Sequence, residues 1–292
     1  MSIAITGATG QLGRLVIGDL LAAGVPANQI TAVARDGGKA ADLAARGIRV
    51  RVADYDRPET FAGAFRSEDR MLLISATDLG RRARQHAAVI DAAAATGVAQ
   101  LAYVGVFGGP EADFLLADEH RETEQLILAT GLPYTFLRNN WYTDAPALTG
   151  DLAGIMARGA IVNSVHADSR IATAPRIDYA AAAAAVLTSD GHLDTAYELS
   201  GDSAWTFGEF AEEVSRQSGT EVAHTYIPPQ EQKAILTGSG LPDALAEILV
   251  DVDDAINRGR LAGTPGDLSR LIGRPTTPMA DTVAAALADL AS

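Results

Sequence analysis

Short apolar runs alternate with amphipathic segments over the first half of the chain, and this alternation predicts the order of its strands and helices. The runs predicted as strands are residues 3–6, 30–34, 48–52, 71–75, 101–104 and 134–137. The segments with helical periodicity between them are residues 11–23, 39–45, about 82–96 and about 118–130. Short apolar strands separated by helices are typical of a parallel sheet covered on both faces. The pattern therefore predicts an α/β fold with a doubly wound (Rossmann) parallel sheet.

The alternation becomes looser after Asn139. Helices are predicted at residues 178–187 and 207–217, with Thr206 as the N-cap of the second, and a strand at residues 222–227 ends at Pro228-Pro229. Neither a low-complexity linker nor an internal repeat separates the two halves. We therefore expect a dinucleotide-binding domain at residues 1–150, with later segments returning to the sheet, and a smaller substrate-side α/β lobe at residues 151–292. The functional site should lie between them, at the carboxyl ends of the strands.

Composition and charge exclude several other classes of protein. The 292 residues are 48% hydrophobic and 21% charged, an ordinary globular composition. No apolar run reaches the roughly 18 residues of a membrane span, and the sequence begins in a predicted strand, so we expect a cytoplasmic protein. The absence of cysteine excludes disulfides and thiolate chemistry. A formal net charge of -14 argues against a nucleic-acid partner. A homodimer is compatible with the sequence, which does not determine the oligomeric state.

A glycine-rich turn between the first predicted strand and the first predicted helix is the strongest local signal. It reads Thr6-Gly7-Ala8-Thr9-Gly10-Gln11-Leu12-Gly13. Gly7 permits a tight turn, Gly10 lets the backbone approach a diphosphate, and Gly13 lets the helix pack close to the strand. The N-terminus of the helix then presents free N–H groups to the phosphates. The turn predicts a dinucleotide site, because the strand before it and the helix after it supply the required context.

The end of the second predicted strand indicates which dinucleotide is bound. NAD sites usually place a carboxylate there, whereas this chain has Arg35 followed by Asp36. A guanidinium can bind a 2′-phosphate through charge-assisted hydrogen bonds, so the sequence favours NADPH. Two alternatives stay open, since Asp36 could still compete and Arg35 could be a solvated charge. Asp54-Tyr55 after the third strand is a candidate adenine contact or a simple turn.

Motifs along nearly the whole chain resemble the atypical short-chain dehydrogenases/reductases of the NmrA-like group, and within it the branch of type 2 quinone oxidoreductases and triphenylmethane reductases. Besides the glycine turn, the motifs are Leu73-Ile74-Ser75, Ala117-Asp118-Glu119-His120 with Thr123-Glu124, Tyr134-Thr135-Phe136-Leu137-Arg138-Asn139, Trp141-Tyr142 and Leu271-Ile272-Gly273-Arg274. The resemblance implies bound NADPH and the reduction of quinones or other flat aromatic acceptors, and it does not choose among acceptors.

The resemblance also implies roles for individual residues. It assigns Gly7, Thr9, Gly10, Gln11 and Leu12 to the pyrophosphate, Arg35 to the 2′-phosphate, Ser75, Ala76 and Thr77 to the ribose, and Asn139, Asn140, Trp141 and Tyr142 to the nicotinamide end. Thr6, which opens the turn, is included in the predicted cofactor site. Two departures from the family pattern are Asn140, where quinone reductases tend to have glycine, and Tyr103-Val104-Gly105-Val106, which lacks the hydroxylated residue that often follows the fifth strand.

The Tyr-x-x-x-Lys pair of typical short-chain dehydrogenases is missing, since Leu116 and His120 stand at the corresponding positions. Alcohol–ketone chemistry by that pair is therefore disfavoured, whereas reduction of a quinone yields a delocalised phenolate and needs no strong acid. His120 is a candidate proton donor or ribose contact, because histidine has a pKa near neutrality, or else a structural histidine. Phe107, Trp141 and Tyr142 are candidates for stacking on the acceptor or for core packing.

The sequence leaves two alternative functions to consider and predicts the roles of several remaining residues. The missing Tyr/Lys pair also permits a non-catalytic NADP(H)-sensing regulatory protein, and it makes a sugar-nucleotide epimerase a weak alternative. His86 is interpreted as structural and Trp205 as a packing residue of the smaller lobe. No metal site is predicted, because Asp251-Val252-Asp253-Asp254 is interpreted as a solvated helix face.

Overall fold

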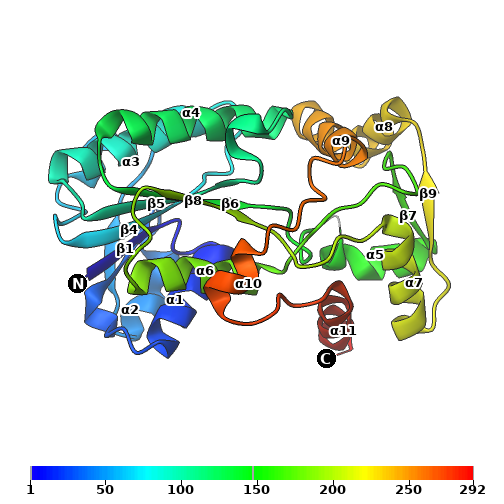
Figure 1. Cartoon of the computed structure of the whole chain (residues 1–292), viewed down its shortest axis with the longest axis horizontal. Coiled ribbons are helices and arrows are strands. Elements are labelled where there is room, and N and C mark those ends of the chain that lie inside the picture. The colour runs from blue at the N-terminus through cyan, green and yellow to red at the C-terminus, as the bar shows by residue number, and fades with distance from the viewer. Residues whose placement is uncertain (1, 147, 292) are drawn as a thin grey trace.

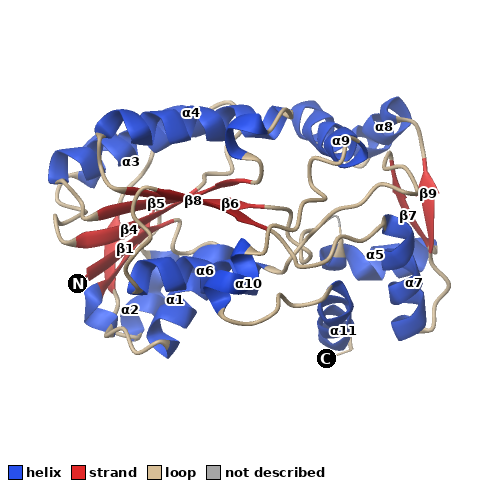
Figure 2. Ribbon diagram, in the orientation of Figure 1, coloured by secondary structure: helices blue, strands red, loops and turns tan. Residues whose placement is uncertain are grey.

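A seven-stranded parallel sheet forms the centre of the computed structural model, which describes residues 2–146 and 148–291 (Figures 1 and 2). The strand order is β3-β2-β1-β4-β5-β6-β8, and all neighbouring strands are parallel. The order reverses between β1 and β4, which opens a crevice at their carboxyl ends. The predicted doubly wound sheet is thereby confirmed. The strands are β1 (Ser2–Thr6), β2 (Ile30–Ala34), β3 (Arg49–Val52), β4 (Asp69–Ile74), β5 (Gln100–Val106), β6 (Tyr134–Asn139) and β8 (Thr195–Leu199).

Helices cover both faces of this sheet (Figure 1). One face carries α1 (Gln11–Ala22), α2 (Ala41–Ala45), α6 (Arg176–Thr188) and α10 (Asp267–Ile272), and the other carries α3 (Arg82–Thr96) and α4 (Leu115–Thr130). Val16, Ile17 and Leu20 of α1 follow a helical spacing and are fully buried on the first face. Val89 and Ile90 of α3 do the same on the second face. Short 3₁₀ helices join the elements at Ala27–Gln29, Gly38–Ala40, Pro58–Phe61, Gly109–Glu111 and Thr149–Asp151.

A smaller lobe lies beyond the carboxyl ends of the strands (Figures 1 and 2). It contains the two-stranded parallel sheet of β7 (Ala160–Asn163) and β9 (Ala223–Tyr226). Around it are α5 (Leu152–Arg158), α7 (Phe207–Ser218), α8 (Pro229–Gly238), α9 (Asp243–Asn257) and α11 (Met279–Leu290). The predicted N-cap Thr206 is confirmed, because its side chain accepts a hydrogen bond from the N–H of Glu209 in a reciprocal capping box. Trp205 is buried in the core of this lobe, as predicted.

The acidic segment at residues 251–254 differs from its prediction as a solvated face. Asp253 is buried, and its Oδ2 accepts hydrogen bonds from the N–H of Ser164 at 3.0 Å and from the Nε2 of Gln232 at 2.8 Å. Its carboxylate therefore joins β7 to α8 and α9. Among the residues that the structure describes, no three His, Asp or Glu side chains gather as a metal site would require.

Two strands, β7 and β8, were not predicted from the sequence. β8 is the last strand of the main sheet and pairs only with β6, and Thr195, Ala196 and Glu198 are not buried. An edge strand that buries few side chains lacks the continuous apolar run of a central parallel strand. Its pairing with β6 is a tertiary contact between segments separated by more than fifty residues of sequence.

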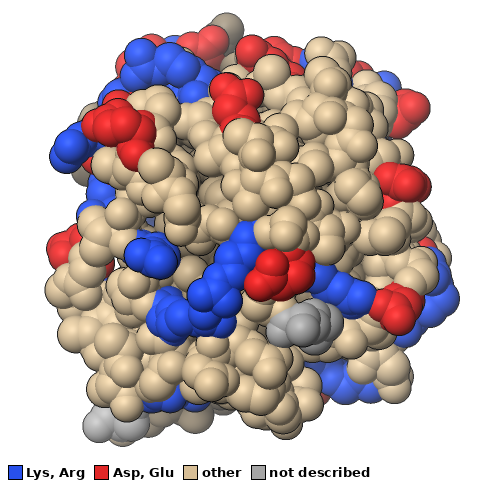
Figure 3. Space-filling view, turned by 90° about the vertical axis from the view of Figure 1, so that its left-hand side faces the viewer, with Lys and Arg blue, Asp and Glu red and all other residues tan. Residues whose placement is uncertain are grey.

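The surface at the amino ends of the strands carries both acidic and basic side chains among many uncharged ones (Figure 3). One of its ion pairs joins Arg70 at the start of β4 to Asp190 after α6. Within the described part of the chain, none of the helices is long and apolar enough to cross a membrane.

Candidate functional site

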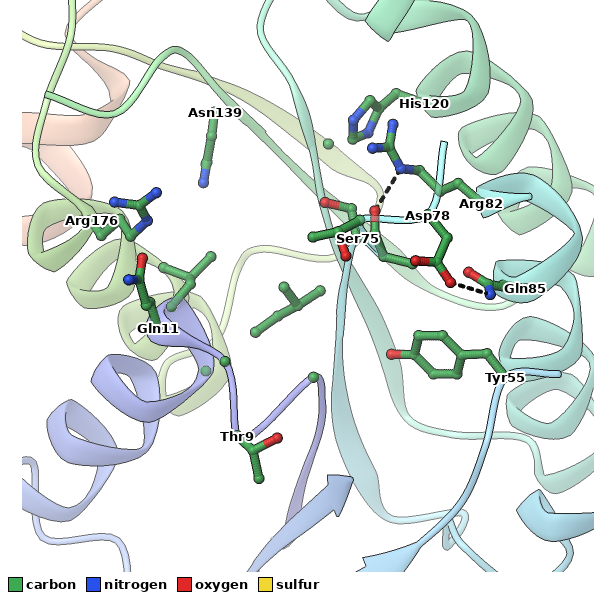
Figure 4. A pocket seen from close by; sticks show the side chains of 18 of the residues that line it. Thr9, Gln11, Tyr55, Ser75, Asp78, Arg82, Gln85, His120, Asn139 and Arg176 are labelled. Atoms are coloured by element: carbon green, nitrogen blue, oxygen red, sulfur yellow. Dashed lines mark hydrogen bonds between the residues drawn. The ribbon is translucent and has the colours of Figure 1, made fainter. Parts of the chain in front are cut away.

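A cavity of about 740 Å³ lies at the carboxyl ends of β1, β4, β5 and β6 (Figure 4). Its wall brings together most of the residues that the sequence singled out: Gly7, Thr9, Gly10, Gln11, Leu12, Arg35, Asp54, Ser75, Ala76, Thr77, His120, Asn139, Asn140, Trp141 and Tyr142. Figure 4 shows Thr9 and Gln11 of the glycine turn across the cavity from Ser75, Arg82 and His120. Parallel strands explain this convergence, because their carboxyl ends meet at one edge of the sheet.

Two predicted site residues do not line this cavity. Thr6 is fully buried, and its hydroxyl lies 3.4 Å from the carbonyl oxygen of Leu72 and accepts the N–H of Ile74 at 3.3 Å, so it joins β1 to β4. Phe107 is buried in the core between the sheet and the smaller lobe, where its ring packs against Gly263. The structure therefore corrects the assignment of Thr6 to the cofactor, and of the two roles predicted for Phe107 it shows core packing instead of stacking on the acceptor.

The glycine turn has the backbone geometry that a diphosphate cradle requires. Gly7 has φ +66°, in the left-handed region that favours glycine. A Cβ on Gly13 would lie 2.4 Å from the carbonyl oxygen of Gly7, so only glycine lets α1 approach the turn this closely. The turn is closed by a hydrogen bond from the N–H of Gly10 to the oxygen of Gly7 at 3.0 Å. Gln11, Leu12 and Gly13 at the start of α1, whose N–H groups have no partner within the helix, line the cavity.

The end of β2 separates the roles of Arg35 and Asp36. Arg35 is exposed and lines the cavity, and within residues 2–146 and 148–291 its guanidinium makes no hydrogen bond or ion pair. The carboxylate of Asp36 instead accepts the N–H of Gly38 at 2.8 Å and does not belong to the cavity wall. The position where an NAD site would present a carboxylate thus presents a free cation.

His86 fixes the loop that follows β4. Its Nε2 accepts the N–H of Ala76 at 2.9 Å, so the ring proton is on Nδ1, which donates to the hydroxyl of Thr123 at 2.9 Å. The carbonyl oxygen of Ala76 accepts the Nε–H of Arg82 at 2.8 Å. Both polar groups of this peptide are therefore held by side chains of α3, and His86 has the structural role predicted from the sequence.

His120 lies in the cavity wall, but its environment differs from the expectation. It is buried, with its Nδ1 2.7 Å from the hydroxyl of Tyr103. Burial, together with the positive charge of Arg82, lowers the pKa of His120 well below 6.5. The predicted role of His120 as a proton donor depended on a pKa near neutrality. The structure corrects that expectation, because a pKa well below 6.5 leaves the imidazole neutral at pH 7.

A pH dependence of stability follows from the buried histidines. Burial, then the charge of Arg82, lowers the pKa of His86 to about 3 in the folded protein, from 6.5. Below pH 6.5 the unfolded chain takes up a proton that the folded protein refuses, so stability falls as the pH decreases from about 6.5 towards 3. We expect His86→Gln to remove about 1.4 kcal/mol per pH unit from this slope. Urea unfolding between pH 7 and 4.5 measures it.

The matched control is His166→Gln, which replaces an exposed histidine of the smaller lobe. Its unfolding free energy should follow the same pH profile as the wild type. Parallel profiles for the wild type and His86→Gln would contradict the neutral state assigned to the buried ring.

Aromatic side chains form another part of the cavity wall. Trp141 and Tyr142 follow β6, and the hydroxyl of Tyr142 accepts the Nδ2–H of Asn139 at 3.2 Å. The guanidinium of Arg176 lies 4.6 Å from the centre of the Tyr142 ring and pairs with Asp144 at 2.9 Å. The sequence did not indicate Arg176, because its position at the start of α6 becomes part of the site only through folding.

The wall also contains polar atoms without partners. Of the eight buried side-chain atoms that lack a hydrogen bond among the described residues, four belong to residues of the cavity wall: Tyr55, Arg82, Gln85 and Asn139. Buried polar groups in folded proteins are almost always paired, so these four residues add polar character to the wall of the cavity. Sequence reasoning missed Arg82 and Gln85, which lie on the first turn of α3 and carry no motif. The cradle at one end and these donors and acceptors along its length fit a dinucleotide.

The fold and this cavity define a class of dinucleotide-binding proteins. Residues 7–190 match the NAD(P)H-binding family, and the chain belongs to that family. It is similar to Quinone oxidoreductase 2 of Escherichia coli (strain K12), with 44% identity over 281 residues that cover 96% of this chain and 97% of the relative.

Comparison with solved structures places the chain among the same proteins. The crystal structure of an NADPH-dependent quinone oxidoreductase from Escherichia coli, complexed with NADPH, superposes with a TM-score of 0.93, 43% identity, and coverage of 98% of this chain and 99% of that one. Triphenylmethane reductase of Citrobacter sp. superposes with a TM-score of 0.91, 41% identity, and coverage of 99% and 100%.

Proposed function

We propose that this protein is an NADPH-dependent reductase that transfers hydride to quinones or similar flat aromatic acceptors. The observation that carries the proposal is a single cavity that joins a diphosphate cradle and a free Arg35 to an aromatic wall at Trp141 and Tyr142. The names of the relatives, a quinone oxidoreductase and a triphenylmethane reductase, support this class of reaction.

The residues present would hold the cofactor along the whole cavity. The backbone from Gly7 to Leu12 would bind the diphosphate, Arg35 the 2′-phosphate, and the loop at residues 75–77 the ribose. The amide of Asn139, with a buried Oδ1 that lacks a partner among the described residues, would bind the carboxamide end. NADPH, when bound, supplies the hydride. Residues 1–150, with later segments such as α6 and β8 returning to the main sheet, are proposed as the nucleotide-binding part, and residues 151–292 as the smaller substrate-side lobe.

The chain does not need a strong acid for such an acceptor. Leu116 cannot exchange a proton, and His120 is neutral and buried. A reduced quinone is a delocalised phenolate that takes its proton from water, so the contribution of the protein is to hold the acceptor ring against the cofactor. A cytoplasmic location is part of the same proposal, since the reaction draws on the NADPH of the cell interior.

A spectrophotometric screen tests the proposed function. Oxidation of NADPH and of NADH is followed side by side with benzoquinone, naphthoquinone and dye acceptors. Multiple turnovers with NADPH are expected. Tight binding of NADPH without turnover on any acceptor would instead support the regulatory, NADP(H)-sensing alternative.

Replacement of Arg35 tests the choice of cofactor. We expect Arg35→Ala to raise the KM for NADPH roughly 10–100-fold, since charge-assisted hydrogen bonds contribute about 1.5–3 kcal/mol. The KM for NADH should change little. The control is Arg57→Ala, which removes an exposed arginine paired with Glu59 outside the cavity. An equal loss for both cofactors in Arg35→Ala would show that this arginine does not bind the 2′-phosphate.

A further inference from the structure

Arg82 places a buried guanidinium in the cavity wall that the cofactor assignment leaves unused. Its side chain is 6% exposed, and its Nε donates to the carbonyl oxygen of Ala76 at 2.8 Å. Its Nη1 is buried and has no hydrogen-bond partner among the described residues. An unpaired buried donor costs free energy unless a ligand pairs with it.

The counter-charge of Arg82 is weak. The nearest carboxylate oxygen, Oε2 of Glu119, lies 3.7 Å from Nη1, beyond hydrogen-bond length, and the other oxygen accepts the backbone N–H of Arg82 at 3.1 Å. Glu124, further along α4, is bound on both oxygens by Arg138. The two histidines close to Arg82 are neutral, and its charge contributes to lowering their pKa values. This part of the cavity is therefore incompletely neutralised.

Arg82 lies at the reactive end of the cavity. Figure 4 shows its guanidinium beside the imidazole of His120, across the cavity from Asn139 and from Gln11 of the glycine turn. Leu116 stands where a short-chain dehydrogenase would place the Tyr that acts on the acceptor oxygen, and His120, one turn further along α4, stands at the place of the Lys that supports it. A cation here is positioned for the acceptor, whereas Arg35 is positioned for the far end of the nucleotide.

The sign of the charge distinguishes two classes of acceptor. A neutral quinone accepts a hydride, gains negative charge on a carbonyl oxygen and then takes a proton from water, so that NADPH, a proton and quinone give NADP⁺ and hydroquinone. A fixed cation stabilises that developing charge. A triphenylmethane dye is cationic before reduction and neutral after it, so the same cation disfavours its binding.

We propose that Arg82 binds the carbonyl oxygen of the acceptor and makes the site selective for neutral quinones over cationic dyes. The proposal rests on the proposed reductase function and names the substrate class within it. Arg82 replaces the missing hydroxyl donor of the Tyr/Lys pair as the group that meets the negative charge.

The experiment compares the wild type, Arg82→Leu and Arg82→Lys with 1,4-benzoquinone and with malachite green, a cationic triphenylmethane dye. In Arg82→Leu, kcat/KM for the quinone should fall on the order of 100-fold, as for loss of one oxyanion donor. Binding of the dye to the NADP⁺-loaded protein, followed by its absorbance, should tighten several-fold. Arg82→Lys should keep the preference for quinone, and the Kd for NADPH, measured for every variant, reports any loosening of the Ala76 loop.

Weaker quinone reduction together with tighter dye binding would show that the charge of Arg82 acts on the acceptor. If Arg82 only supported the structure of the Ala76 loop, its loss would weaken quinone reduction and dye binding alike and raise the Kd for NADPH. That parallel loss, or unchanged quinone kinetics, would overturn the proposal.

If the wild type turns over neither acceptor, the reductase function fails, while the dye titration still tests the charge selectivity. If Arg82→Leu does not fold, Glu119→Gln keeps the acceptor for the N–H of Arg82 and removes the carboxylate charge that lies 3.7 Å from its Nη1. This variant should weaken dye binding further; unaltered dye binding would count against the proposal.

Discussion

Gly13→Ala is expected to weaken the binding of NADPH strongly. The added Cβ would lie 2.4 Å from the carbonyl oxygen of Gly7 and 2.8 Å from the Cα of Ala8, both backbone atoms of the turn itself. The turn or the first turn of α1 must move, so the N–H groups lose their aim at the diphosphate. Overpacking of this kind destabilises a protein by about 1–3 kcal/mol. Loss of charge-assisted bonds should raise the Kd for NADPH on the order of 100-fold.

Gly18→Ala, one and a half turns further along α1, is the matched control. A Cβ on Gly18 would meet no atom within 4 Å. Alanine is the better helix former, so this variant should gain about 0.5–1 kcal/mol and bind NADPH as the wild type does. Fluorescence titration with NADPH and urea unfolding of both variants measure the two effects. Equal affinity in Gly13→Ala and the wild type would exclude close packing of α1 as the origin of the cradle.

Arg138→Ala is expected to give the largest loss of stability. The guanidinium donates to both oxygens of Glu124 at 2.9 and 2.8 Å and to Glu198 at 2.9 Å, and the second oxygen of Glu198 accepts the N–H of Gly108 at 2.7 Å. The side chain of Glu124 is only 7% exposed. Removal of one partner leaves a buried carboxylate without its counter-charge, which costs about 3–5 kcal/mol. Urea unfolding measures this loss.

A double variant and a surface control show whether the loss comes from the unpaired charge. Arg138→Ala with Glu124→Gln should be less destabilised than the sum of the two single variants, because the buried charge has gone. Arg216→Ala removes an exposed arginine that pairs with Glu213 and should change the stability far less than Arg138→Ala does. Comparable losses in Arg138→Ala and Arg216→Ala would rule out a special contribution from the buried network. Arg138 directly precedes Asn139, so this network also supports the part of the cavity wall that Asn139 forms.

Local sequence was sufficient for most of the main sheet and for the cradle. The predicted strand at residues 30–34 and helix at 82–96 agree with β2 and α3 at both ends. The spacing of the glycines was sufficient to predict the conformation of the turn and its close contact with α1. These features depend on the periodicity of apolar residues and on the backbone freedom of glycine, which are both properties of neighbouring residues. Arg35 could be predicted as a residue of the cavity wall for the same reason, since the end of the second strand has a fixed position relative to the turn.

Tertiary structure decided which side chains face the cavity and in what protonation state. Phe107 was a candidate for stacking or for core packing and packs in the core, while Arg82 and Arg176 carried no motif and line the wall. The pKa of His120 is lowered by burial and by Arg82 on a different helix. The sequence alone determined a parallel sheet with a dinucleotide turn, because those signals are local. The charge and shape at the reactive end arise where segments far apart in the chain meet and exclude water, and no local pattern records that.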